Sequence, residues 1–173
     1  MKKGAWLLLF LLLALAENAW AFVIPLDFAF ASYSWPVHFV LIGSLLYTAR
    51  MNRTDRLLWM VLLGLLYDLL FSGSFPYSAL YFGAAGMIFS LSENWRGIFK
   101  EGLLLLLCFL YDALPMGFLM AGGILQCSLL QFLILMELPA FLINIVSMQL
   151  INRLFAWIEP GYHSVLPDRE VFP

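Results

Sequence analysis

The sequence has few charged residues and almost no cysteine. Only 12% of its 173 residues are charged, whereas about 25% is usual in a soluble domain. Its two cysteines, Cys108 and Cys127, lie in apolar sequence and do not form a C-x-x-C pair. We therefore expect packing roles for both cysteines, and neither a disulfide nor a metal site.

Several motifs of catalysis and of nucleic-acid binding are absent too. The chain has no glycine-rich phosphate-binding loop, no nucleophile elbow and no spacing typical of metal ligands. It also lacks a basic patch interleaved with aromatic residues, which is the usual mark of nucleic-acid binding. The net charge of -2 excludes no further class of partner. From these absences we expect no catalytic residue, no metal and no cofactor.

Hydrophobic residues dominate what is present. They make up 64% of the chain, and the mean hydropathy is +0.93. Apolar runs recur along the chain and approach the length of about 20 residues that a helix needs to cross a bilayer. The longest polar stretch is the tail, 159–173. The sequence therefore predicts an all-α polytopic membrane protein, with a single transmembrane helical domain at 1–158 and a short cytoplasmic tail at 159–173.

The apolar runs predict about six membrane-spanning helices joined by short polar links, at residues 5–24, 35–49, 57–71, 78–91, 102–120 and 138–158. The pair Gly122-Gly123 is expected to end the fifth helix. The region 124–158 is too long for one ordinary span and too short for two. We therefore place an interfacial or re-entrant segment at 124–136, where Gln126 and Gln131 add polarity.

The N-terminus allows two interpretations. Lys2 and Lys3 precede a short apolar run that ends in Ala19-Trp20-Ala21, a pattern typical of a cleavable signal peptide. We favour a retained first helix, because residues 22–24 extend the apolar run. Cleavage of 1–21 stays the alternative and would leave five spans.

The distribution of basic residues predicts the orientation. Lysine and arginine concentrate in short cytoplasmic loops. With both termini in the cytoplasm, all 9 basic residues lie on the cytoplasmic side. The expected determinants of topology in the two internal links are Arg50, Arg53, Arg56, Arg96 and Lys100.

The candidate carboxylates Asp68, Asp112 and Glu137 lie within apolar sequence. Asp68 and Asp112 each lie twelve residues beyond a cytoplasmic basic residue, which places both about 18 Å from that flank at the helical rise per residue. Glu137 is expected still nearer the outer face. A charged group at such depth is costly in lipid, so each carboxylate should face the bundle interior and is a candidate functional residue.

The role of each aspartate stays open at this point. A structural role, in which a protonated carboxyl group bonds a neighbouring helix, is favoured for Asp112, which could bond the backbone loosened by Pro115. For Asp68 the structural and functional interpretations weigh equally. His38 is expected to be an interfacial hydrogen-bonding residue and not a metal ligand, since no acidic residue or histidine lies near it at helical spacing.

One family has a similar pattern. The run from Gly64 to Leu80, GLLYDLLFSGSFPYSAL, resembles the core of MreD, the rod shape-determining membrane protein of bacteria. The shared features are a glycine, an aspartate on a helix, a small Gly/Ser turn and an Ala-Leu pair that opens the next helix. The chain length, the pair Tyr111-Asp112, and Pro139 and Asn144 in the last span agree with this resemblance.

The resemblance implies a non-enzymatic scaffold in the bacterial cytoplasmic membrane. Such a protein is implied to bind MreC and to link the actin-like MreB to the glycan polymerase and transpeptidase that build the lateral wall. Its fold is implied to be similar to the substrate-binding subunits of energy-coupling-factor transporters. Asp68 with Ser72 and Gly73 would then either tie the third and fourth spans together or receive a partner helix. The basic links would face anionic lipid and cytoplasmic partners.

Two other functions were weighed. A vitamin-binding subunit of an energy-coupling-factor transporter would have a similar layout, but residues 7–13 are bulky where such subunits carry small docking residues, and no outer loop offers an obvious ligand-sized polar set. An intramembrane aspartic protease would use Asp68 and Asp112 as a dyad. Leu66-Tyr67-Asp68 resembles half of the presenilin-type pair, but its GxGD partner is absent.

Overall fold

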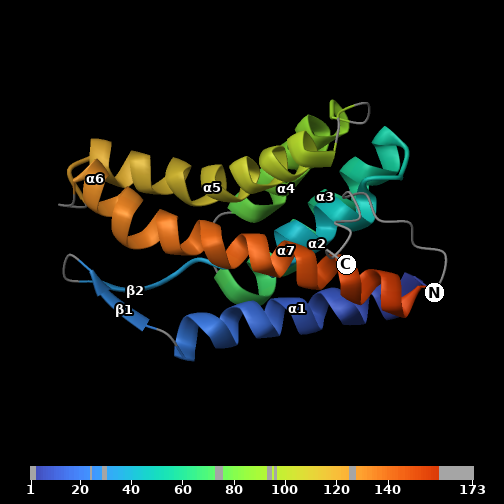
Figure 1. Ribbon diagram of the computed structural model, residues 1–173, viewed down its shortest axis with the longest axis horizontal. Coiled ribbons are helices and arrows are strands. Elements are labelled where there is room, and N and C mark those ends of the chain that lie inside the picture. The colour runs from blue at the N-terminus through green and yellow to red at the C-terminus, as the bar shows by residue number, and fades with distance from the viewer. Residues whose placement is uncertain are drawn as a thin grey trace, which may run out of the picture.

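The computed structural model describes residues 3–23, 25–28, 31–72, 76–92, 95, 97–124 and 128–159 (Figure 1). The chain folds into helices joined by short links, together with one small β-hairpin. The elements are α1 (Lys3–Val23), β1 (Pro25–Phe28), β2 (Ala31–Ser34), α2 (Phe39–Thr48), α3 (Arg53–Tyr67), the π-helical segment η1 (Asp68–Ser72), α4 (Tyr77–Ser90), α5 (Gly97–Ala121), α6 (Leu129–Gln131), the π-helical segment η2 (Phe132–Glu137) and α7 (Leu138–Ile158).

The predicted helical character is confirmed. Among the described residues, three helical stretches are long and apolar enough to cross a membrane, namely Gly4–Val23, Gly97–Ala121 and Leu129–Ile158. A shorter apolar helix spans Phe39–Thr48. Length and composition are therefore compatible with a membrane protein. The expected end of the fifth helix is also found, since α5 stops at Ala121 and Gly123 adopts a φ of 68°, a conformation suited to glycine.

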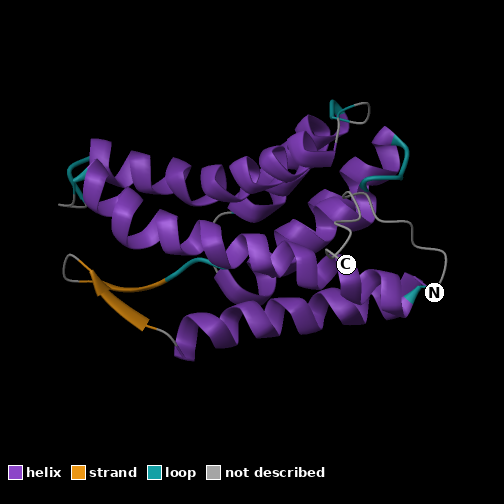
Figure 2. Ribbon diagram, viewed as in Figure 1, coloured by secondary structure: helices purple, strands orange, loops and turns teal. Residues whose placement is uncertain are grey.

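The hairpin after α1 was not predicted. A short polar link was expected between the first two apolar runs, but β1 and β2 pair antiparallel there, with Pro25 opposite Ser34 and Phe28 opposite Ala31. Figure 2 shows this hairpin as the one orange element beside purple helices. Four-residue strands have too little periodicity to be recognised in an apolar sequence, which explains the omission.

The prediction of a separate interfacial or re-entrant segment at 124–136 is wrong from residue 129 on, and residues 125–127 lie outside the described residues. A single helical stretch runs from Leu129 through η2 to Ile158 without a break. Its first turn is a capping box, in which the Gln131 amide donates to Ser128 Oγ and the Ser128 amide donates to Gln131 Oε1. Gln131 therefore caps the N-terminus of this helix, where its side-chain oxygen accepts from a backbone amide that has no helical acceptor.

Helix α2 lies at the centre of the bundle. It contacts α1, α3, α4, α5 and α7, and Leu41, Ile42, Leu45 and Leu46 on it are almost fully buried. Its two buried hydroxyl side chains, on Ser44 and Thr48, donate to carbonyls of the preceding turn of the same helix. These two hydroxyl groups therefore have hydrogen-bond acceptors within their own helix, so neither is buried among apolar side chains without a partner.

Helices α3 and α4 pack closely through small residues. A Cβ added to Gly86 would lie 2.7 Å from Met60 Cγ, and one added to Gly83 would lie 2.9 Å from Val61 Cγ2. The small residues of α4 therefore allow the two helices to approach closely at these two positions.

Arg56 has a structural position that the sequence analysis missed. It was expected on a basic link facing lipid and cytoplasmic partners, but its side chain is only 1% exposed. Nε donates to the Thr48 carbonyl, and Nη2 donates to the carbonyls of Ala49 and Met51. A cation at the C-terminus of α2 satisfies carbonyls that have no helical donor and interacts favourably with the helix dipole. Arg50 and Lys100 lie nearer the surface, and Arg96 lies outside the described residues.

We expect Arg56→Ala to destabilise the protein, because three carbonyls at the end of the central helix lose a charged donor. Removing one partner of a hydrogen bond to a charged group lowers the free energy of unfolding by about 2 kcal/mol. The matched control is Arg53→Ala, since Arg53 is exposed on the same link. Thermal unfolding in detergent micelles measures both variants, and equal midpoints for the two would contradict the capping role.

Candidate functional site

Asp68 joins α3 to α4. Its carboxyl group is 4% exposed and accepts hydrogen bonds from two backbone amides in the first turn of α4, with Ser78 N at 3.1 Å from Oδ1 and Ala79 N at 2.9 Å from Oδ2. Pro76, which precedes α4, supplies no side-chain cap. Asp68 therefore caps a neighbouring helix, and its negative charge suits the positive end of that helix dipole.

Gly64 allows this cap to form. It lies one turn before Asp68, and a Cβ added to it would come within 2.4 Å of the Ser78 carbonyl oxygen and 2.7 Å of Ala79 Cα. The backbones of α3 and α4 meet here without an intervening side chain. Asp68 was expected either to tie the third and fourth spans together or to receive a partner helix. Its contacts within the chain are those of a tie between α3 and α4. Ser72 ends η1, and Gly73 lies outside the described residues.

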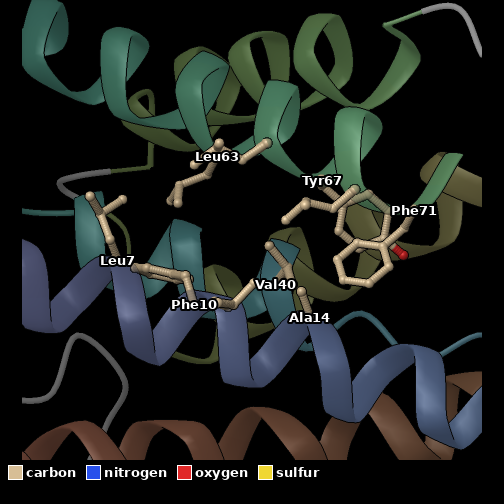
Figure 3. A pocket seen from close by; sticks show the side chains of 10 residues that line it. Leu7, Phe10, Ala14, Val40, Leu63, Tyr67 and Phe71 are labelled. Atoms are coloured by element: carbon tan, nitrogen blue, oxygen red, sulfur yellow. The ribbon is translucent and has the colours of Figure 1, made fainter. Parts of the chain in front are cut away.

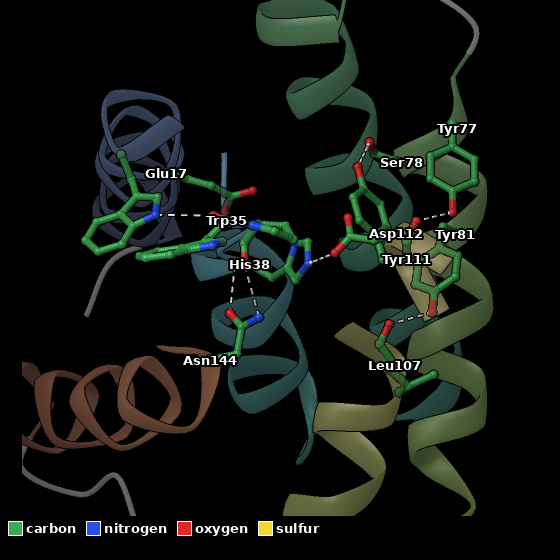
Figure 4. Close-up of polar contacts among 12 residues, drawn as sticks. Glu17, Trp35, His38, Tyr77, Ser78, Tyr81, Leu107, Tyr111, Asp112 and Asn144 are labelled. Atoms are coloured by element: carbon green, nitrogen blue, oxygen red, sulfur yellow. Dashed lines mark hydrogen bonds and ion pairs between the residues drawn. The ribbon is translucent and has the colours of Figure 1, made fainter. Parts of the chain in front are cut away.

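Asp112 on α5 pairs with His38, which lies just before α2. Asp112 Oδ2 and His38 Nε2 are 2.7 Å apart, and the two side chains are 17% and 5% exposed (Figure 4). His38 is thus a hydrogen-bonding residue, as expected. The sequence analysis found no acidic neighbour for it, because its partner is 74 residues away.

Asn144 on α7 holds the backbone of the segment before α2. Its Oδ1 accepts from the His38 amide at 3.0 Å, and its Nδ2 donates to the Pro36 carbonyl at 3.3 Å (Figure 4). Both polar atoms of one amide side chain therefore fix the same strap of chain. The predicted candidates Asp112 and Asn144 meet at His38.

Two prolines within helices free carbonyls that other elements use. Pro115 has no amide hydrogen for the carbonyl of Tyr111, and the Tyr77 hydroxyl donates to that oxygen at 2.7 Å. The expectation that Asp112 would bond this backbone is wrong, because Asp112 is paired with His38. Pro139, another predicted candidate, likewise leaves the carbonyl of Leu135 without its helical donor, and the Trp35 indole donates to it at 3.3 Å.

Glu17 belongs to the site, although it was not among the candidate residues predicted from the sequence. Its Oε2 accepts from the Val40 amide at 3.0 Å, and its Oε1 accepts from the Tyr67 hydroxyl at 2.9 Å. Glu17 on α1 thus caps α2 as Asp68 caps α4. A carboxylate within an apolar run was the signal that identified Asp68, and it applied equally to Glu17.

Several hydroxyl groups from α4 and α5 lie near the two aspartates. The Ser78 and Tyr111 hydroxyl oxygens are 2.7 Å apart, and the Tyr81 hydroxyl donates to the Leu107 carbonyl at 2.6 Å (Figure 4). Ser78 also bonds Asp68 through its amide. Asp68 and Asp112 therefore lie in adjoining parts of one polar region. Each carboxyl group has its own partners, and among the described residues no hydrogen bond joins the two aspartates as a protease dyad would require.

A cavity of about 170 Å³ opens in this region, lined by Glu17, Asn18, Trp20, Ala21, Trp35, Pro36, Val37, His38, Tyr67, Tyr111 and Asp112. A ligand-sized set of polar groups is therefore present, although the sequence offered no obvious outer loop for one. It is assembled from α1, the strap before α2, α3 and α5. Glu137, the remaining predicted carboxylate, lines a separate small cavity together with Asp112.

A second cavity, of about 40 Å³, is apolar. It lies between α1, α2 and the end of α3, among the side chains labelled in Figure 3. Tyr67 contributes the one hydroxyl group of its lining, and that hydroxyl donates to Glu17. In the described part of the chain, no group of three or more His, Cys, Asp or Glu side chains is suited to hold a metal ion. The polar cavity is therefore the better candidate for a binding site.

Comparison of the chain with models of known protein families, with curated proteins and with solved structures finds no match.

Proposed function

We propose that this chain is a non-enzymatic, multi-pass membrane scaffold of the MreD type. In this role it would lie in the bacterial cytoplasmic membrane, bind MreC, and link MreB to the glycan polymerase and transpeptidase of lateral peptidoglycan synthesis. The observation that carries the proposal is the tie between α3 and α4. The residues that resemble the MreD core, from Gly64 through Asp68 to Ser78 and Ala79, are those that build this tie.

The arrangement of the helices is compatible with the six spans that the proposal requires. In the part of the chain that the structure describes, six helical units follow one another, namely α1, α2, α3 with η1, α4, α5, and α6 with η2 and α7. Helix α1 begins and α7 ends at the same end of the bundle (Figure 1). An even number of spans with both termini in the cytoplasm would produce this arrangement.

Two features suit a scaffold more than an enzyme. Asp68 and Glu17 both use their carboxyl oxygens to cap helices, which leaves Asp68 committed to backbone amides. Many large apolar side chains also lie exposed on the outer faces of the helices, among them Leu8, Leu69 and Phe118. Such faces can contact lipid or the helices of partner proteins.

The test is co-purification from the native membrane. The full chain is tagged at its C-terminus and extracted in mild detergent, and the bound proteins are identified by mass spectrometry. We expect MreC together with the wall-building polymerase. An unrelated multi-pass protein with the same tag is the control for non-specific recovery. Absence of MreC after cross-linking in intact cells would contradict the proposal.

One observation favours a second candidate, the substrate-binding subunit of an energy-coupling-factor transporter. The cavity of about 170 Å³ combines aromatic and ionisable side chains, as a pocket for a small molecule does. The same co-purification separates the two functions. Recovery of paired ATPases with a large transmembrane coupling subunit would support the transporter and exclude the scaffold.

A further inference from the structure

The polar region carries more acidic than basic groups. Glu17 and Asp112 line the larger cavity together with His38, and Glu137 lines the smaller cavity together with Asp112. His38 can supply at most one positive charge, and neither cavity that Asp112 lines contains a lysine or an arginine. A surplus of carboxylates in an apolar surrounding is costly unless a cation or protons balance it.

Glu137 is a second and independent observation. Its side chain is only 6% exposed, and its Oε1 atom has no hydrogen-bond partner in the described part of the protein. It faces a cavity of about 10 Å³ that it shares with Asp112 and Asn144, which is about the size of one water molecule. A buried carboxyl oxygen without a donor is uncommon in folded proteins and indicates a missing positively polarised partner.

Asp112 lies between this small cavity and the larger one, because it lines both. His38 bonds its Oδ2 atom, and within the described residues Oδ1 receives no hydrogen bond from the protein. Glu17 lines the larger cavity from the side of α1. Two carboxyl groups on different helices therefore face one space, and their positions are fixed by the bonds to His38, Val40 and Tyr67.

The remaining wall of the larger cavity is aromatic. Trp20 and Trp35 line it, and the Trp20 indole donates to the Trp35 carbonyl at 3.2 Å, which fixes one ring on the strap that carries the other. Tyr67 and Tyr111 complete this wall. Aromatic faces attract cations, most strongly where water is excluded. Carboxylates combined with aromatic rings are the usual environment for an ammonium group.

We propose that the cavity between α1, the strap at 35–38 and α5 binds the ammonium group of a small organic amine, with Asp112 and Glu17 as its anionic partners. Asp112 accepts hydrogen bonds from the ammonium group through Oδ1, and Glu137 adds negative potential behind it. The amine is either a free molecule or the ethanolamine headgroup of a lipid, since both present the same primary ammonium. This binding activity goes beyond a scaffold role and does not depend on it.

The probe is butylammonium chloride, titrated against the full chain in neutral detergent. Thermal unfolding and intrinsic tryptophan fluorescence report binding, the latter because Trp20 and Trp35 line the cavity. A ligand that binds the folded state raises the unfolding midpoint in a saturable manner. Sodium chloride at equal ionic strength and butan-1-ol are the controls for screening and for the apolar chain. We expect saturable stabilisation by butylammonium alone.

Isosteric variants test the two carboxylates. Asp112→Asn keeps an acceptor for His38, and Glu17→Gln keeps an acceptor for Val40, so both should fold. Loss of one charged hydrogen bond weakens binding by about tenfold or more. Asp55→Asn is the matched control, because Asp55 is exposed in the first turn of α3, outside the polar region, and should bind as the unaltered chain does. If one variant does not fold, the other still decides the question.

Two outcomes would overturn the proposal. One is an equal shift of the midpoint with sodium chloride or with butan-1-ol. The other is unaltered affinity in both Asp112→Asn and Glu17→Gln. If the proposal holds, nanodiscs distinguish the source of the amine. Weaker butylammonium binding in phosphatidylethanolamine discs than in phosphatidylcholine discs would identify the lipid headgroup as the occupant, and equal binding would identify a free amine.

Discussion

Asp68→Ala is expected to be among the most destabilising substitutions in this protein. The change removes both acceptors of the Ser78 and Ala79 amides at the start of α4. A buried amide left without a partner costs about 1–3 kcal/mol, and in lipid no water replaces the acceptor. We therefore expect the free energy of unfolding to fall by about 4 kcal/mol for the two amides together. Unfolding in mixed detergent micelles, followed by circular dichroism, measures the loss.

Two further variants show whether the cap is responsible. Asp68→Asn keeps one acceptor oxygen and should lose about half as much stability. Asp55→Ala removes an exposed carboxylate from the same helix and should leave stability nearly unchanged. If Asp68→Ala were no less stable than Asp55→Ala, the tie between α3 and α4 would not contribute to folding, and the main support for the scaffold proposal would be lost.

Gly64→Ala is expected to have a comparable effect for a steric reason. The new methyl group would lie 2.4 Å from the Ser78 carbonyl oxygen and 2.7 Å from Ala79 Cα, and both are backbone atoms that cannot turn aside. Helix α4 must move away, and the bonds from its first turn to Asp68 lengthen as it does. Overpacking of this kind costs about 1–3 kcal/mol and sometimes more. The unfolding measurement described for Asp68 also applies here.

Gly117→Ala is the matched control, because nothing lies within 4 Å of a Cβ at that position of α5. It should be neutral or slightly stabilising, since alanine favours a helix over glycine by about 1 kcal/mol. The double variant Gly64→Ala, Asp68→Ala should lose less stability than the sum of its parts, because both changes break the same contact. Full additivity would show that the two residues act independently.

One hydrogen bond links the tie between α3 and α4 to the polar cavity. Ser78 bonds Asp68 through its amide and Tyr111 through its hydroxyl, and Tyr111 lines the cavity next to Asp112. A ligand or partner that moves Tyr111 would therefore act on the start of α4. Binding of an amine or of a partner helix at the cavity would therefore change the position of α4.

Local features of the structure were predictable from the sequence. Long apolar runs indicated helices, and paired glycines indicated the end of α5. Asp68 and Asp112 stood out as polar residues in apolar surroundings. These predictions succeed because hydropathy, helix ends and helix packing surfaces depend on residues a few positions apart.

Local chemistry was also where some predictions failed. Gln131 was interpreted as a sign of an interfacial or re-entrant segment, but it completes a capping box with Ser128. Arg56 was interpreted as a residue that faces lipid, but it caps α2. In both cases a polar side chain bonds backbone groups at a helix end, where the need for a donor or an acceptor depends on where the helix starts or stops.

The composition and the order of residues by themselves determined that the chain is helical, apolar enough for a membrane, and supplied with a few carboxylates at depth. Only the tertiary structure decided which groups those carboxylates meet. The pairing of His38 with Asp112 spans 74 residues, and the contact of Trp35 with Leu135 spans 100. The periodicity of a helix determines which face a residue occupies, but the partner of that face depends on how separate helices pack, and no local pattern encodes that choice.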